Sequence, residues 1–554
     1  MPSRFASLVA ASALGVLAVA PAAADAPGRD LGVTYQVKEL IQGAQIHGAN
    51  GLALDADGQL VVASVWGGEL VVVDPRTGAI RDRLGHEVGV DGPDDVALGP
   101  DGSLYWTDIL TGEVGRLSPE GTTTKQFVAE WVNPIAFTDD GRLFVGSALF
   151  ADGLFELDPA LIDAPRVVIP PSGSPPLNGF DFGPDGMLYA PQPDLARIVR
   201  VNPETGDVAV IADLPESSTS VEFDSSGTLF AGLGDGRIVT VDTDDGSLET
   251  VATIPVGPDN MVFDESGRLY ASGGDDGSIH VVAQGRGVRT LIRGGLIMPG
   301  GVAVMPRSGE SESLFVADLW TLAEFDARSG RLIDVDGDGI IEPWTAAPDG
   351  DHVILTSFLS NAVQVWDPRD NTAAATYEGF AAPLNALRFQ GDLVVAELGT
   401  GSVVRQDAGG TRTTIADSAT LPPPGLFVPS GLAAMGDDLW VADWATGIIW
   451  KIAGEGAPRI VTGGLAAPEG MAVDHDGSLL VVESGAGRLS RVDPITGAVS
   501  TVVDGLAMDV AGPQGLPPTF AMSSVAVDSH GTMLVSGAGA ERSVVYRIKE
   551  LPAR

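Results

Sequence analysis

A segment of about forty residues recurs along almost the whole chain, and this repeat limits the possible folds more than any other feature. Each copy has a short alternating apolar run, a tight turn and a second such run, as in GPDDVALGPDGSLYWTD from Gly92. Asp–Gly pairs such as Asp101–Gly102 supply the turns, because both residues tolerate positive φ. A second hairpin usually follows, as in ELVVVDPRTGAIRDRL. Four strands per copy, with a period of two and no helical period, predict the blade of a β-propeller.

The spacing of the copies indicates how many blades there are. The residues just before the first strand of each copy are Asn50, Asp94, Asn133, Asn178, Thr219, Asp259 and Gly300 and, after one degenerate copy, Asn385, Ser430, Glu469 and Ser523. A single ring of twelve blades would be unusually wide. The sequence therefore predicts an all-β tandem β-propeller of two six-bladed rings, residues 41–297 and 298–554, with seven plus five blades as the alternative.

Both ends of the chain carry segments outside the repeat. Residues 1–24 contain an apolar run and then small residues, which predicts a secretory signal peptide and an exported protein, in the periplasm or the medium. Residues 33–40 (VTYQVKEL) form a lone strand, whereas the last copy lacks its outer strand. We expect this N-terminal strand to close the last blade, because an unpaired blade edge exposes backbone donors and acceptors.

Charge and composition exclude several classes of function. The chain has 32 basic and 74 acidic residues, a net charge of −42, and no cysteine. This charge repels nucleic acid and anionic lipid, so no nucleic-acid partner is expected. The acidic excess can equally belong to a merely soluble surface, without a specific function that involves cations. No apolar run after the signal peptide is long enough to span a membrane. Without cysteine, thiol catalysis and cysteine-ligated metal sites are excluded, and no phosphate-binding glycine loop, HExxH or GxSxG motif is present.

Polar residues are concentrated where the innermost strands of the first ring begin. The start of a blade's first strand and the end of its second share one face, around the central opening, because the two strands are antiparallel. The amides and carboxylates at these positions are Asn50, Asp94, Asp108, Asn133, Asn178 and Asp259. Converging oxygen ligands suit calcium or another hard divalent cation. Taken singly, each of these residues can instead cap a turn at a solvent-filled channel mouth.

Two histidines lie near the same face. His47 and His86 precede innermost strands, beside Asn50 and Asp94, whereas the other four lie in turns of the opposite face or inside strands. An imidazole can act as a general base near neutral pH, although a loop histidine can equally be a solvated surface residue. The expected catalytic residues are His47, Asp94 and His86.

The second ring has two acidic features. Its mouth carries Asp318, Glu397, Asp443, Glu469 and Glu483 but no suitably placed histidine, which indicates cation binding or surface charge. The segment DVDGDGIIE places Asp334, Asp336 and Asp338 at alternate positions before Gly339, like the opening of a calcium loop. Position twelve of such a loop is Thr345, so Glu342 would have to replace the usual acid. An acidic loop between blades is the alternative.

The repeats resemble those of the senescence-marker-protein/gluconolactonase family and the related NHL-type propellers. The resemblance rests on "NG" or "DG"-like starts followed by "F/LDxxGxLYVA" and covers nearly all of the mature chain. It implies a divalent cation, held by a Glu, an Asn and an Asp at the starts of innermost strands, that polarises a lactone or ester carbonyl. "LNG" at Asn178 resembles the family's Asn and "PDNM" at Asp259 its Asp, whereas Asn50 stands in place of the Glu. In the second ring, "PEGM" offers Glu469 as a candidate for the family's Glu, but its position in the order of blades does not match that of the family.

Two functions from different classes follow. The first is an exported metal-dependent hydrolase of lactone or ester type, with calcium as the expected ion and a small molecule or glycan as ligand. Its expected cation ligands are Asn50, Asn178 and Asp259. Its expected substrate contacts are Asn133, Asp108 and Trp66. The second is a non-catalytic exported propeller that binds a glycan, peptide or protein, and a lyase of the antibiotic-opening propeller type is a third option.

Overall fold

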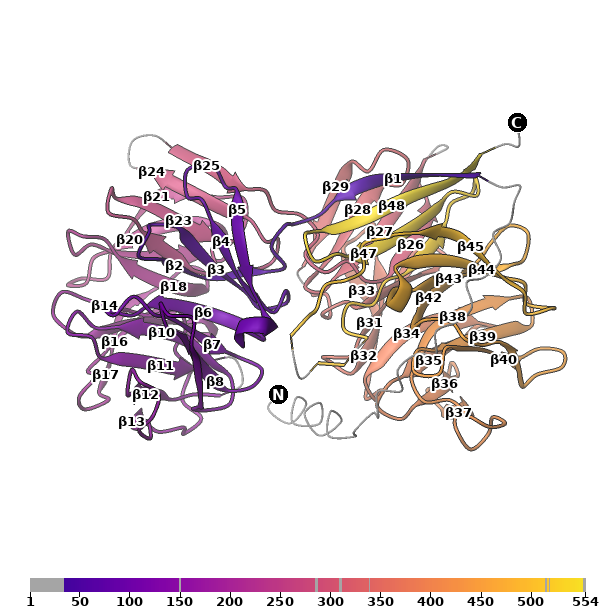
Figure 1. Cartoon of the computed structure of the whole chain (residues 1–554), viewed down its shortest axis with the longest axis horizontal. Helices are drawn as coiled ribbons and strands as arrows, with labels where there is room; N and C mark the ends of the chain where they lie inside the picture. The colour runs from indigo at the N-terminus through magenta and orange to yellow at the C-terminus, as the bar shows by residue number, and fades with distance from the viewer. Residues whose placement is uncertain are drawn as a thin grey trace. The chain divides into compact units, whose positions relative to one another are not determined.

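The computed structural model describes residues 34–551 except 149–150, 284–286, 308–310, 338, 514–515 and 518. It contains twelve four-stranded antiparallel sheets, which confirms the predicted tandem β-propeller with its twelve blades (Figure 1). Regular helix among the described residues is limited to three-residue 3₁₀ turns such as His86–Val88. None of the helices described is long and apolar enough to cross a membrane. The predicted signal peptide, residues 1–24, lies outside the described residues.

The chain divides into two compact units. The first propeller comprises Ala44–Ile297 with Ala511–Leu516, and the second comprises the chain up to Gly43, Met298–Val510 and the chain from Pro517. The innermost strands of the first propeller are β2 (Ala49–Leu54), β6 (Pro93–Leu98), β10 (Val132–Phe137), β14 (Asp181–Phe182), β18 (Ser218–Phe223) and β22 (Met261–Phe263). Those of the second are β26 (Val302–Pro306), β30 (Thr345–Asp349), β34 (Pro383–Phe389), β38 (Pro429–Met435), β42 (Pro468–Val473) and β46 (Val525–Val527).

Each propeller closes on itself through hydroxyl groups at the blade boundaries. Ser272, which ends β23 (Arg268–Ser272) in blade 6, donates from Oγ to the carbonyl of Asn50 in blade 1 at 2.6 Å. In the second propeller, Ser536 of β47 (Met533–Ala538) in blade 12 donates to the carbonyl of Gly300, which precedes blade 7. Blades 1 to 6 and blades 7 to 12 therefore form separate rings.

The last blade is completed by the N-terminal strand, as the sequence predicts. Strand β1 (Thr34–Gln42) pairs antiparallel with β48 (Ser543–Leu551), from Thr34↔Leu551 to Gln42↔Val544, with a bulge between Glu39 and Ile41. In Figure 1 the indigo β1 lies beside the yellow β48. The backbone edge that β48 would otherwise expose is thus hydrogen-bonded.

The hydrophobic core lies between successive blades. One cluster joins Phe144 and Leu154 of blade 3 to Leu188 and Val199 of blade 4. This arrangement follows from the alternation of period two, because each strand presents one set of apolar side chains to each neighbouring blade. The core thereby leaves the innermost strand ends free to carry polar residues around the channel.

Candidate functional site

The first propeller brings carboxylates and amides together at one mouth of its channel. Asn50 in β2 donates from Nδ2 to Asp94 Oδ1 in β6, at 3.3 Å. Asn133 in β10 also hydrogen-bonds the Asp94 side chain. Asp259, in the loop before β22, is held by a hydrogen bond from its backbone N–H to the carbonyl of Ser272 at 2.8 Å. Three successive blades thus position Asp94, and its charge interacts with that of Asp259 from blade 6.

Burial, and for Asp94 and Asp259 also the charge of neighbouring acids, raises the pKa values of the carboxyl groups at this mouth. Burial raises the pKa of Asp94 well above its usual range, and the charges of Asp259 and Asp95 raise it further. Burial, followed by the charges of Asp275 and Asp95, raises the pKa of Asp259 to about 7. Burial is also the main cause of the raised pKa of Asp108. Like-charged carboxylates in a desolvated position are stabilised by a proton or a bound cation.

Two oxygens at this mouth have no hydrogen-bond partner among the described residues. They are Asn50 Oδ1 and Asp108 Oδ2, and both atoms are buried. Asp108 ends β7 (Leu104–Asp108), and its other oxygen accepts the backbone N–H of Thr111 at 3.3 Å. Buried acceptors without a donor are energetically unfavourable, and they match the oxygen ligands that calcium prefers. The donor set at this mouth therefore fits a divalent cation.

Asn178 and Trp66 complete the mouth residues named from the sequence. Asn178 lies before β14, and its Oδ1 accepts the N–H of Gly179 at 2.9 Å. Among the described residues no hydrogen bond joins Asn178 to Asp94 or Asp259. Trp66 is half-buried and lies against Gly48, where a Cβ would come within 2.6 Å of the indole Cδ1.

The two histidines have different surroundings. His47 is buried, and its Nδ1 donates to the carbonyl of Ile297, the last residue of the first propeller, at 2.6 Å. This ring nitrogen therefore holds the two ends of the propeller together. His86 is mostly exposed and contacts Asp91 Oδ1 through Nδ1 at 2.7 Å, while Lys125 contacts the other oxygen of Asp91.

A second group of acids lies deeper in the same channel and was missed by the sequence reasoning. Asp95, Asp181 and Glu222 line a cavity of about 340 Å³ together with Asn260. Asp95 Oδ2 accepts the N–H of Ile135 from the next blade at 3.1 Å, and Asp181 Oδ2 accepts that of Phe223 at 2.9 Å. Each acid thus satisfies a donor of the neighbouring innermost strand.

Burial raises the pKa of these deeper acids as well. The pKa of Asp95 rises to about 7 and that of Asp181 to about 6. The pKa of Glu222 rises well above its usual range, through burial and then the charge of Asp181. The sequence does contain a signal for these acids, namely a polar residue at a channel-facing position of an apolar innermost strand, as for Asp181 in FDF and Glu222 in VEF.

In the second propeller the acids at the strand ends anchor loops. Their carboxylates accept backbone N–H groups from the segment before the innermost strand of the same blade. The pairs are Asp318 with Met298, Glu397 with Ala381, Asp443 with Val428 and Glu483 with Ala466. All four carboxylates are buried. They are therefore internal hydrogen-bond acceptors rather than exposed surface charge.

Glu469 in β42 makes the stability of the second propeller depend on pH. It is buried, and its Oε2 accepts the N–H of Ser523 at 2.6 Å. Burial raises its pKa to about 8. Because the pKa of Glu469 is higher in the folded than in the unfolded chain, its contribution to the free energy of unfolding is complete below its pKa in the unfolded chain. That contribution is lost as the pH rises through about 8.

We expect Glu469→Gln to flatten this pH dependence. From pH 6 to pH 9 the native chain should lose about 2–3 kcal/mol of unfolding free energy that the variant retains. Urea titrations of both proteins across this range measure the difference. Glu455→Gln, which changes an exposed acid, serves as the control and should follow the native curve. Parallel curves for Glu469→Gln and the native chain would contradict the assignment.

The first two acids of the predicted calcium loop in the second propeller lie in a strand. Asp334 and Asp336 belong to β29 (Leu332–Asp336), the outermost strand of blade 7, where Asp334 pairs with Glu324. Asp338 lies outside the described residues. Glu342 accepts a hydrogen bond from Ser357 Oγ at 3.4 Å. The extended backbone at Asp334 and Asp336 differs from the curved backbone of a helix–loop–helix calcium site.

Another acidic group with a histidine also lies in the second propeller. Ligand atoms of Glu312, Asp528 and His530 lie within 4.8 Å of one another. Ser529 donates its N–H to Glu312 at 3.0 Å, and His530 donates its own to Asp528 at 2.9 Å. The group could hold a divalent metal, but turn hydrogen bonds already account for its geometry.

Comparisons with known proteins gave structural neighbours but no match to a family or a curated sequence. Solved structures similar to it include virginiamycin B lyase from Staphylococcus aureus, with 13% identity over 51% of this chain and 96% of the other and a TM-score of 0.37. A gluconolactonase from Xanthomonas campestris has 19% identity over 46% and 94% of the two chains, with a TM-score of 0.37.

A longer match is an extracellular domain assigned to a one component system of B. thetaiotaomicron. It has 13% identity over 92% of this chain and 82% of the other, with a TM-score of 0.32. At such identities the likeness concerns the fold alone. The neighbours include a gluconolactonase, the kind of protein that the repeats resemble, and a virginiamycin B lyase.

Proposed function

We propose that this chain is an exported hydrolase of lactones or esters that acts at the channel mouth of the first propeller and requires a divalent cation, with calcium as the expected ion. The observation that carries the proposal is the group of buried Asp94 with half-buried Asn50 and Asp259, in which two carboxyl groups have raised pKa values and a buried amide oxygen has no donor. A cation would relieve both conditions at once.

The residues at the mouth divide into ligands and a base. Asn50 uses its Nδ2 to contact Asp94, which leaves Oδ1 for a cation together with Asp259 and, from blade 4, Asn178. When bound, the cation would polarise the carbonyl group of a lactone or ester. Asp94, oriented by the amides of Asn50 and Asn133, would accept the proton of the attacking water. Its raised pKa makes it a stronger base than an ordinary carboxylate.

The remaining mouth residues would position the substrate. Asp108 Oδ2 is buried and lacks a donor, so it can accept a hydroxyl hydrogen of the substrate. Asn133 and Trp66 would provide further polar and apolar contacts. His47 would support the site from behind, because its Nδ1 is engaged by Ile297, and His86 would remain outside it.

Metal removal tests the proposal directly. We expect the purified mature protein to hydrolyse simple aldonolactones or aryl esters, to lose this activity in a chelator, and to regain it with added calcium or another divalent cation. Elemental analysis before and after chelation measures the bound ion. Turnover that a chelator does not change would contradict the proposal. A bound ion with no turnover of any lactone or ester would instead favour the non-catalytic binding function.

A further inference from the structure

Two equivalent grooves between neighbouring blades differ in a way that suggests a second ligand site. One lies between blades 3 and 4 of the first propeller and the other between blades 10 and 11 of the second. In the former, β11 (Leu143–Ser147), β12 (Leu154–Leu157) and β13 (Arg166–Ile169) align Phe144, Glu156 and Arg166 across the sheet. In the latter, β39 (Asp438–Asp443), β40 (Ile448–Ala453) and β41 (Arg459–Thr462) align Trp440, Lys451 and Arg459.

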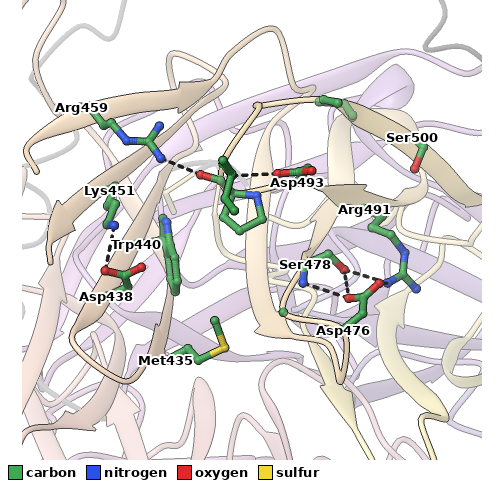
Figure 2. A pocket seen from close by; sticks show the side chains of 15 residues that line it. Met435, Asp438, Trp440, Lys451, Arg459, Asp476, Ser478, Arg491, Asp493 and Ser500 are labelled. Carbon is green, nitrogen blue, oxygen red and sulfur yellow. Dashed lines mark hydrogen bonds and ion pairs between the residues drawn. The ribbon is translucent and has the colours of Figure 1, made fainter. Parts of the chain in front are cut away.

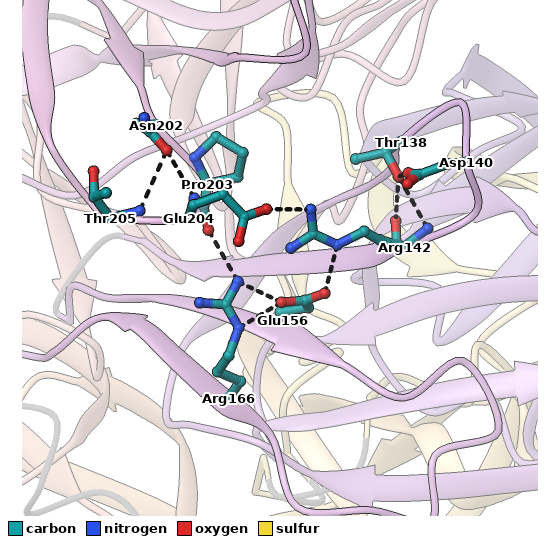
Figure 3. A network of polar contacts seen from close by, with 9 residues as sticks. All are labelled: Thr138, Asp140, Arg142, Glu156, Arg166, Asn202, Pro203, Glu204 and Thr205. Atoms are coloured by element: carbon teal, nitrogen blue, oxygen red, sulfur yellow. Dashed lines mark hydrogen bonds and ion pairs between the residues drawn. The ribbon is translucent and has the colours of Figure 1, made fainter.

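The groove between blades 3 and 4 is closed by charged side chains, as Figure 3 shows. Glu156 accepts hydrogen bonds from Arg142 Nε at 2.7 Å and from Arg166 Nε at 2.5 Å. Arg142 also crosses to Glu204 of blade 4, with 2.6 Å between Nη1 and Oε1. Arg166 donates to the carbonyl of Pro203 at 2.9 Å. We call this the closed groove.

The groove between blades 10 and 11 lacks this crossing pair. Aligning the strands places Asp438 at the position of Arg142, and aligning the turns NPETG and DPITG places Ile495 at that of Glu204. Arg459 still donates to the carbonyl of Pro494 at 2.7 Å, as Arg166 does to Pro203. The Ile495 side chain is 84% exposed, and a cavity of about 500 Å³ remains. We call this the open groove (Figure 2).

One wall of the open groove carries excess positive charge. Lys451 occupies the position of Glu156 and pairs with Asp438 at 2.8 Å, with its side chain 8% exposed. Arg459 has therefore lost the carboxylate that its counterpart Arg166 contacts. No carboxylate among the described residues lies within ion-pair distance of Arg459, whose hydrogen bonds go to backbone carbonyls. In a chain with a net charge of −42, such a wall is suited to an anionic group.

The opposite wall favours hydroxyl groups over further negative charge. Arg491 is already bound by Asp474 at 2.7 Å and by Asp476 at 3.0 Å, and it donates to Ser478 Oγ at 2.7 Å. Figure 2 shows Ser478, Asp476 and Arg491 across the groove from Lys451 and Trp440. These carboxylates would repel a doubly charged phosphate group but can accept hydrogen bonds from hydroxyls.

We propose that the open groove binds a sugar acid, that is, a small polyhydroxylated ligand with one carboxylate. Arg459 and Lys451 would bind the carboxylate, and Asp476, Ser478 and Ser500 would bind the hydroxyl groups. The volume of the cavity is within the range of small-ligand pockets. The site belongs entirely to the second propeller, so it does not rest on the proposed hydrolase centre.

Isothermal titration calorimetry of the mature chain tests this proposal with three probes: glucuronate, glucose and glucose 1-phosphate. We expect saturable binding of one glucuronate per chain, and at least about tenfold weaker binding of the neutral and phosphorylated sugars. Arg459→Gln should weaken glucuronate binding by at least about tenfold. Ile495→Glu, which introduces a carboxylate where the closed groove has Glu204, should also weaken it by competing for Lys451 and Arg459.

The closed groove supplies a matched control. Arg166→Gln removes the arginine equivalent to Arg459, together with the same contact to a proline carbonyl, and should leave glucuronate binding unchanged. Circular dichroism confirms that each variant is folded. Absence of glucuronate binding to the folded native chain would overturn the proposal. So would equal affinity for glucose or glucose 1-phosphate, or glucuronate binding that survives both Arg459→Gln and Ile495→Glu.

Discussion

Replacing Asp94 by Asn is expected to lower kcat for lactone or ester hydrolysis by about 10²–10⁴-fold while leaving cation affinity within a few-fold of native. The amide keeps the shape of the side chain and can still hydrogen-bond Asn50 and Asn133, but it cannot accept a proton. Asp259→Asn should have a different effect. It removes a proposed ligand, so cation binding should weaken together with activity, and added cation should restore part of the rate.

Steady-state kinetics at several cation concentrations, with calorimetric titration of calcium, separate these two effects. Asp244→Asn, in an exposed turn of blade 5, is the control and should match the native chain in both measurements. If Asp94→Asn retains full kcat, the base is another group. If Asp259→Asn retains both cation affinity and rate, the cation does not bind at this mouth.

Deleting β1, residues 34–42, is expected to destabilise the second propeller by several kcal/mol, so that it unfolds at a much lower temperature or urea concentration than the native propeller. The deletion removes the whole β1–β48 ladder and exposes the backbone edge of β48. The first propeller begins at Ala44 and closes without this strand, so its transition should remain.

Differential scanning calorimetry and limited proteolysis show which propeller is lost. A double substitution, Lys38→Ala with Glu39→Ala, changes exposed side chains of β1 but keeps its backbone ladder, and should cost far less stability. Adding a synthetic peptide of residues 34–42 to the deletion variant should restore part of the transition. An unchanged unfolding profile after the deletion would show that β1 contributes little to closure.

The blades could be predicted because their determinants are local. Turn residues such as Asp101–Gly102 and the alternation of period two specify each hairpin from a few adjacent residues. The closing strand could also be predicted, because a lone strand and an incomplete last blade complement each other. Both features depend on patterns that are visible in the sequence without knowledge of side-chain packing.

The surroundings of individual side chains could not be predicted from such local patterns. His47 is close in sequence to Asn50, but its Nδ1 partner is Ile297, which is 250 residues away. Asp334 and Asp336 follow a calcium-loop spacing, but pairing of β29 with β28 (Thr321–Asp326) keeps them in a strand. Asp95, Asp181 and Glu222 become neighbours only when the ring closes. Long-range contacts therefore decide the chemistry of residues whose local pattern is ambiguous.

Pairing of β1 with β48 has a consequence for biosynthesis. The strand that completes blade 12 is made before either propeller, whereas its partner β48 is made after all the other strands of both propellers. The six blades of the first propeller can pack together as soon as they have emerged, because all of their strands lie within residues 49–292. The N-terminal strand of the second propeller must stay unpaired until β48 has been made, and during that interval a holding chaperone would protect it from aggregation.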